Sequence, residues 1–278
     1  MSPSWIFPGC AVNVYQMLGP FPSSAAAPSI WYDAVLVPKR KPGGSSGWGT
    51  GTILQVSVEI RRGTGRYLTR GEGYFTRHSF SFGSHYDPEN VAFGPLVCHD
   101  DHRLKAGAGF PDHEHRDVEI VTWVLSGSLR HTDSCGHDAV VRPGEVQVLS
   151  AGSGVTHAEV AGPEGQVRFV QAWLTPEETG TPPAYSLTPV TLTPGELTEV
   201  VELGSRRLLV ARLGPGDTVT LPDEPLQHAF VAGGALTRSS LAEPLADGDA
   251  FRITDSPGLE VTAAVPTELM VWAFLSGA

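Results

Sequence analysis

Short apolar runs separated by turn-forming residues recur along the chain from about Ile53 onward. Alternating or β-branched runs of four to eight residues between Gly, Pro, Asn, Asp and Ser predict β-strands, and no 12-residue window carries a helical stripe. The pattern therefore predicts an all-β fold of sandwiches or barrels. The predicted strands are Ile53–Ile60, Val91–Cys98, Val118–Leu125, Val146–Leu149, Val155–Val160, Val167–Leu174, Leu208–Leu213, Ala229–Leu236 and Leu269–Leu275.

Two segments rich in Gly, Pro and Ser divide the chain. Residues 1–55 contain several such clusters, which are typical of a flexible leader without packed structure. A second cluster, Thr175–Pro183, separates two groups of strands and is the best internal domain boundary. We therefore predict a leader over residues 1–55, a first β domain over 56–175 and a second over 186–278.

Composition excludes several classes of protein. The 278 residues carry a net charge of −11, which is unsuited to a surface that neutralises nucleic-acid phosphates. The hydrophobic fraction of 41% is enough for a core, and no apolar run is long enough to span a membrane. Cys10, Cys98 and Cys135 form no CxxC pair, so a disulfide framework is not expected. We therefore expect a reducing, cytoplasmic location.

Histidine is concentrated in the first predicted domain. Of the 10 histidines, all but His228 lie between His78 and His157. Chemistry that depends on imidazole is therefore expected in residues 56–175. GxGxxG, GxxxxGK and HExxH are all absent, which disfavours dinucleotide-binding, P-loop and zincin functions.

Two pairs of candidate metal ligands occur at a spacing of two residues. A strand places residues i and i+2 on one face, so His113 and His115 would point the same way, as would His157 and Glu159. If two such strands face each other inside a barrel, three imidazoles and one carboxylate converge on a single ion. The alternative is that each pair is solvated near a strand end, which is the usual fate of an isolated HxH.

Other candidates have an ordinary structural interpretation beside the functional one. Glu119 is a competing carboxylate ligand, or forms a salt bridge with Arg116 or Arg130. Trp123 lines a substrate pocket, or packs in the core. Cys135 is a reactive thiol, or part of a hairpin turn, which its Ser, Gly and Asp neighbours favour.

Several of these motifs together resemble bacterial members of the pirin family. The resemblance covers about Val58 to Pro183, with the motifs in the family order and at nearly the family spacing. It implies a bicupin, that is, two antiparallel β-barrels of the double-stranded β-helix type. The matching segments are Arg77–Gly83, His113–Leu125, His131–Ser134, Pro143–Glu145 and Ser150–Glu159.

The resemblance also implies one metal ion in the first barrel, held by His113, His115, His157 and Glu159. General cupins use the glutamate that follows HxH, here Glu119, so the choice of carboxylate stays open. The family points to Fe(II), whereas imidazole and carboxylate ligands also suit Zn, Ni, Co or Mn. The second domain has no HxH and is expected to be a metal-free cupin that serves as packing partner and lid. Where the family usually has Pro between the two histidines, this chain has Glu114, which should point away from the ion.

By the same resemblance, the expected function is a quercetin 2,3-dioxygenase, an oxidoreductase that opens the central ring of flavonols with dioxygen. Glu159 would be both ligand and proton acceptor, and the partner would be a small flavonol-like aromatic substrate. The alternative is an iron-binding, redox-responsive regulator that acts through protein–protein contacts without turnover. A third hypothesis is a zinc cupin that binds a sugar or a small acid. A monomer that binds neither nucleic acid nor membrane is expected in each case.

Overall fold

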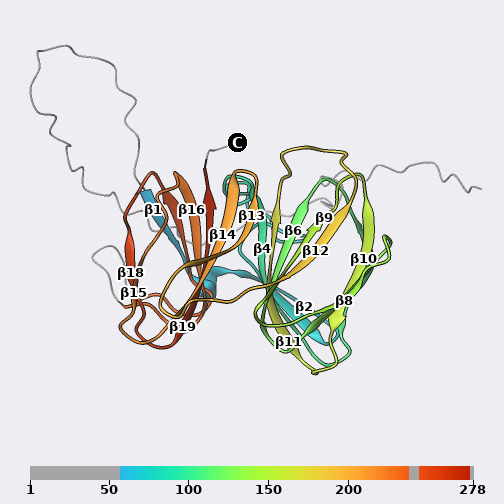
Figure 1. Cartoon of the computed structure of the whole chain (residues 1–278), viewed down its shortest axis with the longest axis horizontal. Coiled ribbons are helices and arrows are strands. Elements are labelled where there is room, and N and C mark those ends of the chain that lie inside the picture. The colour runs from blue at the N-terminus through green and yellow to red at the C-terminus, as the bar shows by residue number, and fades with distance from the viewer. Residues whose placement is uncertain (1–56, 238–243, 276–278) are drawn as a thin grey trace, which may run out of the picture.

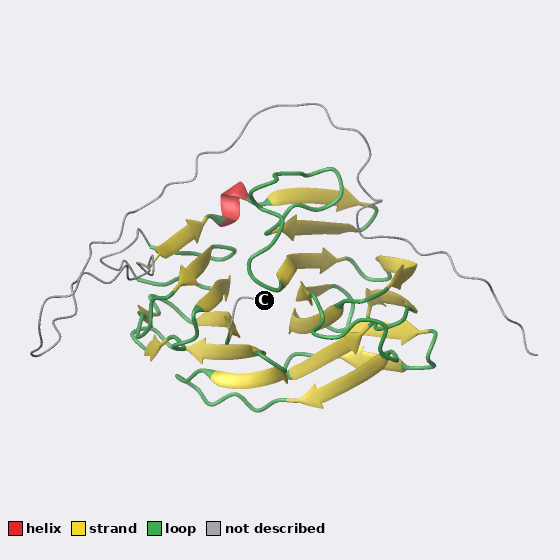
Figure 2. Cartoon of the chain, turned by 90° about the horizontal axis from the view of Figure 1, so that it is seen from above, coloured by secondary structure: helices red, strands yellow, loops and turns green. Residues whose placement is uncertain are grey.

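The computed structural model describes residues 57–237 and 244–275, so the predicted leader over 1–55 and Cys10 lie outside the described residues. The described chain is nearly all β-strand, and its one helix is the short 3-10 turn η2 (Gly63–Gly65), shown in Figure 2. Every strand pairing within it is antiparallel, as predicted. No helix in these residues is long and apolar enough to cross a membrane.

Two sheets enclose the core of the first half of the molecule (Figure 1). A seven-stranded sheet has the order β12-β9-β6-β11-β4-β3-β2, and a four-stranded sheet has the order β5-β10-β7-β8. The two sheets share a core but no strand pairing, so they form a jelly-roll-like sandwich and not the closed barrel that was predicted. The strands are β2 (Tyr67–Gly71), β3 (Tyr74–His78), β4 (Leu96–Leu104), β5 (Gly109–His115), β6 (Glu119–Ser126), β7 (Leu129–Asp133), β8 (Asp138–Val141), β9 (Glu145–Ser150), β10 (Val155–Ala161), β11 (Val167–Leu174) and β12 (Ala184–Pro189).

The second half repeats this architecture with fewer strands. A six-stranded sheet, β1-β17-β16-β19-β14-β13, lies beside a two-stranded sheet, β15-β18. Two sandwiches of this type fit the predicted bicupin. The strands are β1 (Ser57–Arg61), β13 (Thr198–Leu203), β14 (Arg206–Leu213), β15 (Thr218–Thr220), β16 (Leu226–Gly233), β17 (Ala250–Thr254), β18 (Glu260–Thr262) and β19 (Thr267–Phe274).

Two strands cross the boundaries that we predicted from the sequence. Strand β1 pairs with β17 of the second half, although it precedes every strand of the first half, and Figure 1 shows it in blue among orange and red strands. Strand β12 pairs with β9 of the first half, although it follows the Pro-rich segment. Residues 57–61 therefore belong to the second sandwich, although the predicted range 56–175 placed them in the first domain. Residues 184–189 belong to the first sandwich, although the second domain was predicted to begin at 186.

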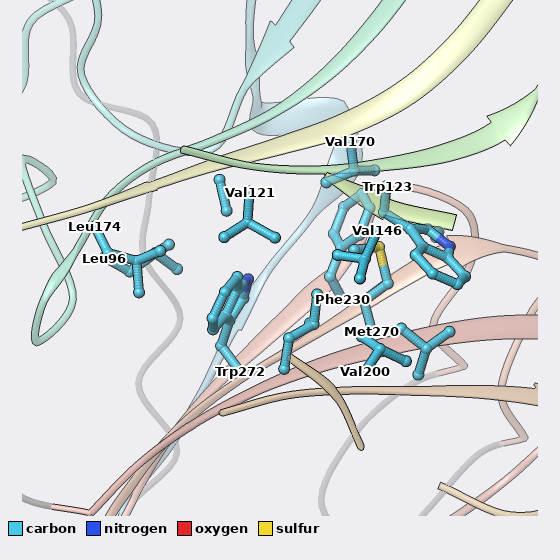
Figure 3. Packing of buried hydrophobic residues seen from close by; sticks show 14 of the residues in the cluster. Leu96, Val121, Trp123, Val146, Val170, Leu174, Val200, Phe230, Met270 and Trp272 are labelled. Atoms are coloured by element: carbon cyan, nitrogen blue, oxygen red, sulfur yellow. The ribbon is translucent and has the colours of Figure 1, made fainter. Parts of the chain in front are cut away.

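The largest apolar cluster joins the two halves (Figure 3). Alternate residues of β6, β9 and β11, such as Val121 and Val170, face the second half and meet Phe230, Met270 and Trp272. Trp123 belongs to this cluster, is fully buried and donates from Nε1 to Glu268 Oε1 of the second half at 2.7 Å. The core interpretation of Trp123 is therefore correct. Burial of these apolar side chains stabilises the contact between the two halves.

A pair of buried histidines at this interface predicts sensitivity to acid. The rings of His99 and His228 lie 4.7 Å apart, and neither nitrogen of His99 has a hydrogen-bond partner. Burial, together with Arg66, lowers the pKa of His99 to about 3, against about 6.5 in an unfolded chain. Between about pH 6.5 and pH 3, His99 binds a proton in the unfolded chain but not in the folded chain. Stability should therefore fall from about pH 6.5 toward pH 3, by about 1.4 kcal/mol per pH unit for this residue.

We expect His99→Leu to remove this contribution. Urea unfolding at about pH 7 and about pH 5 should show that the variant loses about 2 kcal/mol less than the wild type over this interval. Phe274→Leu serves as the control, because Phe274 is buried in the same interface between the halves and binds no proton, so this variant should keep the wild-type pH dependence. Equal acid losses in wild type and His99→Leu would contradict the prediction.

Candidate metal centre

The interior of the first half is apolar at both ends and polar in the middle. On β10 the inward residues alternate as Val155, His157, Glu159 and Ala161, and all four are buried. Val155 belongs to one apolar cluster and Ala161 to another, so the two polar side chains lie between them. Because uncompensated polar burial is costly, this position in the core calls for a dedicated set of partners.

Three histidines come together at this level. Strand β5 pairs with β10, and the register sets His113 directly opposite His157, with His115 two residues farther along. The ring centroids lie 4.3 Å apart for His113 and His157, 4.9 Å for His113 and His115, and 5.0 Å for His115 and His157. One nitrogen from each ring lies within 4.8 Å of the others. The two strands are neighbours in one sheet, whereas we had considered two strands facing each other across a barrel.

The nitrogens of these rings are arranged to accept a cation. Nε2 of His115 and Nε2 of His157 are buried without a hydrogen-bond partner. Nδ1 of His113 lies 2.7 Å from the Pro111 carbonyl, to which it donates, and this leaves Nε2 with the lone pair. Burial and the neighbouring imidazoles lower the pKa of His115 and of His157 to about 3, so both rings are neutral at neutral pH. Three converging imidazoles with unused nitrogens fit a divalent transition metal.

Glu159 lies beside this cluster and outside it. A carboxylate oxygen of Glu159 lies within 4.8 Å of nitrogens of His157 and His131, in a second group that excludes His113 and His115. Its two oxygens accept hydrogen bonds from Gln147 Nε2 at 3.1 Å and from Gln171 Nε2 at 2.8 Å. The structure thus brings three of the four predicted ligands into one group. The assignment of Glu159 as the fourth ligand stays a prediction.

A polar row across the seven-stranded sheet holds this carboxylate, and our sequence analysis missed it. Gln147, Thr122 and Gln171 stand next to one another in the register of β9, β6 and β11. Tyr185 Oη donates to Oε1 of Gln147 at 3.1 Å, and Trp173 Nε1 donates to Oε1 of Gln171 at 3.0 Å. These contacts turn both amide NH2 groups toward Glu159. The available signal was a single polar residue in the middle of each of three apolar strands.

Comparison with known proteins gives the family. The Pirin family model matches residues 61–174. A Mycobacterium tuberculosis protein named "Putative quercetin 2,3-dioxygenase" is 42% identical over 234 residues, which are 79% of this chain and 96% of the relative. A "Pirin-like protein" of Caulobacter vibrioides is 33% identical over 210 residues, which are 70% of this chain and 90% of the relative. The chain belongs to the pirin family.

A solved pirin structure agrees with this membership. The structure of bacterial pirin YhhW in complex with nickel(II), from Escherichia coli, superposes with a TM-score of 0.71 at 26% sequence identity. The match covers 78% of this chain and 98% of that chain, so it spans both sandwiches. That relative binds a metal ion, and the pirin described here has histidines arranged to bind one.

Glu119, the alternative carboxylate, has a different role in this pirin. It accepts a short hydrogen bond from Ser150 Oγ, and it is in neither group of candidate ligands among the described residues. The salt bridge that we considered for it does not form with Arg130, which pairs with Asp138 instead. Because Glu159 is grouped with His157 and Glu119 is not, the geometry favours Glu159 as the acidic group near the histidines.

Cys135 lies in the tight turn between β7 and β8, where its backbone N–H donates to Asp133 Oδ1 at 2.9 Å. The same carboxylate oxygen accepts the backbone N–H of His137 at 3.0 Å. An aspartate that caps two following backbone groups is a common turn device, so the turn interpretation of Cys135 is correct. Asp133 is thereby fixed as a hydrogen-bond acceptor.

A series of aromatic rings extends from the histidine cluster to the surface. His115 packs edge-on against Trp173 at 4.8 Å, and Trp173 packs edge-on against Phe82 at 5.6 Å. Phe82 stacks in turn on His78 at 4.9 Å and is 36% exposed. Phe82 comes from the loop between β3 and β4. This loop therefore contributes an exposed aromatic ring that Trp173 separates from the histidine cluster.

Proposed function

We propose that this pirin is a metal-dependent dioxygenase that opens the central ring of flavonols such as quercetin, using one dioxygen and releasing one carbon monoxide. The observation that carries the proposal is the group of three histidines, with unpartnered nitrogens, beside a buried carboxylate. Names of relatives support the reaction class. We further propose one divalent ion per chain, Fe(II), held by His113, His115 and His157, with Glu159 as the fourth ligand.

The chain's own residues would bind the substrate and take its proton. A bound divalent ion would supply Lewis acidity toward an oxygen of the substrate. Glu159 would accept the proton of the flavonol 3-hydroxyl, since a carboxylate oxygen that accepts one hydrogen bond keeps a further lone pair. Gln147 and Gln171 hold that carboxylate in one orientation, so little reorganisation is needed when the proton arrives.

Turnover tests the proposal directly. Protein loaded with Fe(II) should consume oxygen and release carbon monoxide with quercetin, and should do neither with a flavone that lacks the 3-hydroxyl. Metal-free protein is the matched blank. If no metal-loaded preparation consumes oxygen with a flavonol, the enzyme proposal is wrong. The regulator that we considered as the alternative is not favoured by any contact among the described residues.

Phe82 should contribute to substrate binding. Stacking or edge-on contact between aromatic rings is worth about 0.5–1.5 kcal/mol, so Phe82→Ala should raise the KM for quercetin roughly 2- to 12-fold with kcat nearly unchanged. Val91→Ala is the matched control, because Val91 is 47% exposed in the same loop and lies outside the aromatic series. Steady-state oxygen uptake measures both constants. A fall in kcat with constant KM would show that Phe82 does not line the substrate site.

A further inference from the structure

Behind the histidine cluster, a line of hydrogen bonds leads from His157 away from the other two histidines. Nδ1 of His157 lies 3.5 Å from Nδ1 of His131, and Nε2 of His131 lies 3.2 Å from Oδ2 of Asp133. His131 is fully buried, His157 is 1% exposed and the Asp133 side chain is buried as well.

Strand pairing builds this line. His131 and Asp133 are two residues apart on β7, so they share a face, and the register sets them opposite Glu159 and His157 of β10. The ring of Tyr185 stacks on His131 at 4.7 Å with an interplanar angle of 19°, which limits rotation of the imidazole. The position of His131 is therefore fixed by its strand, by a carboxylate and by an aromatic ring.

The chemistry of the partners decides where the protons lie. An ionised aspartate only accepts hydrogen bonds, so Nε2 of His131 carries the hydrogen and Nδ1 is left as an acceptor. His157 must then donate from Nδ1, and its lone pair is on Nε2. Nε2 of His157 is the buried nitrogen that has no partner. The line of contacts thus selects the tautomer of His157 whose lone pair is on Nε2. This nitrogen can bind an ion together with His113 and His115.

We propose that His131, held by Asp133, is a positioning residue that fixes the tautomer and the ring orientation of His157 for metal binding. The inference deepens the proposed function, because it takes His157 as a ligand. It assigns a role to two buried residues that the three-histidine cluster does not use. Partners of this kind generally change metal affinity about 10- to 100-fold when they are removed.

The variants separate the acceptor role of His131 from its packing. His131→Phe keeps an aromatic ring on Tyr185 and removes the acceptor, whereas His131→Asn restores an acceptor oxygen near the place of Nδ1. Asp133→Asn has nearly the size of the native residue, and its amide would present N–H to His131 and reverse both tautomers. His137→Phe is the matched control, because His137 also stacks on Tyr185 and bonds Asp133 Oδ2, but has no contact with His157.

Two measurements are made on the full chain. Nitrogen-15 NMR of the metal-free protein reports the tautomer of His157, and competition with a chelator reports the affinity for Ni(II). We expect the wild type and His137→Phe to show the tautomer with hydrogen on Nδ1. His131→Phe should lose this preference and bind Ni(II) roughly 10- to 100-fold more weakly. His131→Asn should recover the tautomer and most of the affinity, and Asp133→Asn should show the opposite tautomer.

Several results would overturn the inference. The inference is wrong if His131→Phe and His137→Phe bind Ni(II) with equal affinity. It is also wrong if His131→Asn binds Ni(II) as weakly as His131→Phe. If His131→Phe abolished binding while His113→Ala retained it, the ion would lie between His131, His157 and Glu159, and His131 would be a ligand. A wild type that binds no Ni(II) would refute the proposed metal centre, while the tautomers of the metal-free proteins would still decide the role of His131.

Discussion

His113→Ala should lose bound metal and flavonol turnover together. His113 is half-buried at the end of β5, so its removal leaves the two apolar clusters of the first half intact. It supplies one of three converging nitrogens, and two imidazoles hold a divalent ion far more weakly than three. We expect an affinity loss of more than about 100-fold, beyond the usual effect of removing a ligand's supporting partner. Elemental analysis after dialysis and oxygen uptake with quercetin measure the two losses.

Glu114→Ala is the matched control for this variant. Glu114 lies between the two histidines on β5 and is exposed. Adjacent strand residues face opposite ways, so its carboxylate should not reach the ion. Metal content near that of the wild type is expected. A strong loss in Glu114→Ala, or full retention in His113→Ala, would refute the assignment of ligands on β5.

Local periodicity was enough to pair His113 with His115 and His157 with Glu159, and the resemblance to the pirin family joined the two pairs into one predicted site. The structure places the three histidines in one group. The period of a strand fixes which side chains share a face, whatever the rest of the fold does. Which two strands are adjacent is a matter of topology. For this reason the spacing of the residues was compatible with two facing strands, whereas β5 and β10 are paired.

The amide row that holds Glu159 could not be predicted in the same way. Gln147, Thr122 and Gln171 come from three strands, and their alignment depends on the register of β9, β6 and β11. A polar residue within an apolar strand suggests a buried hydrogen bond, but it does not identify the partner. The same limit applies to His131, whose contact with His157 depends on the pairing of β7 with β10.

Strand β4 shows why apolar patterning misplaced one element. The run Val91–Cys98 predicted a strand, but β4 begins at Leu96, after Gly94 and Pro95, and continues through four charged or ionisable residues, 99–102. Burial of these polar residues is possible because most of them have hydrogen-bond or ion-pair partners. Asp100 accepts from His78 at 2.7 Å, and Asp101 forms a bidentate pair with Arg168. A strand whose polar residues are paired in the interior does not have an apolar pattern, so periodicity alone does not reveal it.

Glu159→Gln should reduce turnover much more than metal binding. The substitution keeps the size of the side chain and one acceptor oxygen but removes the charge and the basicity. Metal affinity should weaken modestly, since three imidazoles remain. Turnover should fall by roughly 10²-fold or more, which is the usual contribution of a positioned base. In addition, the new NH2 group would face the NH2 of Gln147 or Gln171, so stability should fall by about 1–3 kcal/mol.

Glu119→Gln is the control for this last variant, because Glu119 bonds Ser150 and is grouped with none of the histidines. It should change metal content and oxygen uptake much less than Glu159→Gln. Metal titration separates the two roles of Glu159, since a base can be lost while the ion is retained. If Glu119→Gln abolished metal binding and Glu159→Gln were nearly silent, the arrangement of general cupins would apply. The buried carboxylate between two glutamines would then be a structural group, and the proton acceptor would have to be sought at the end of β6.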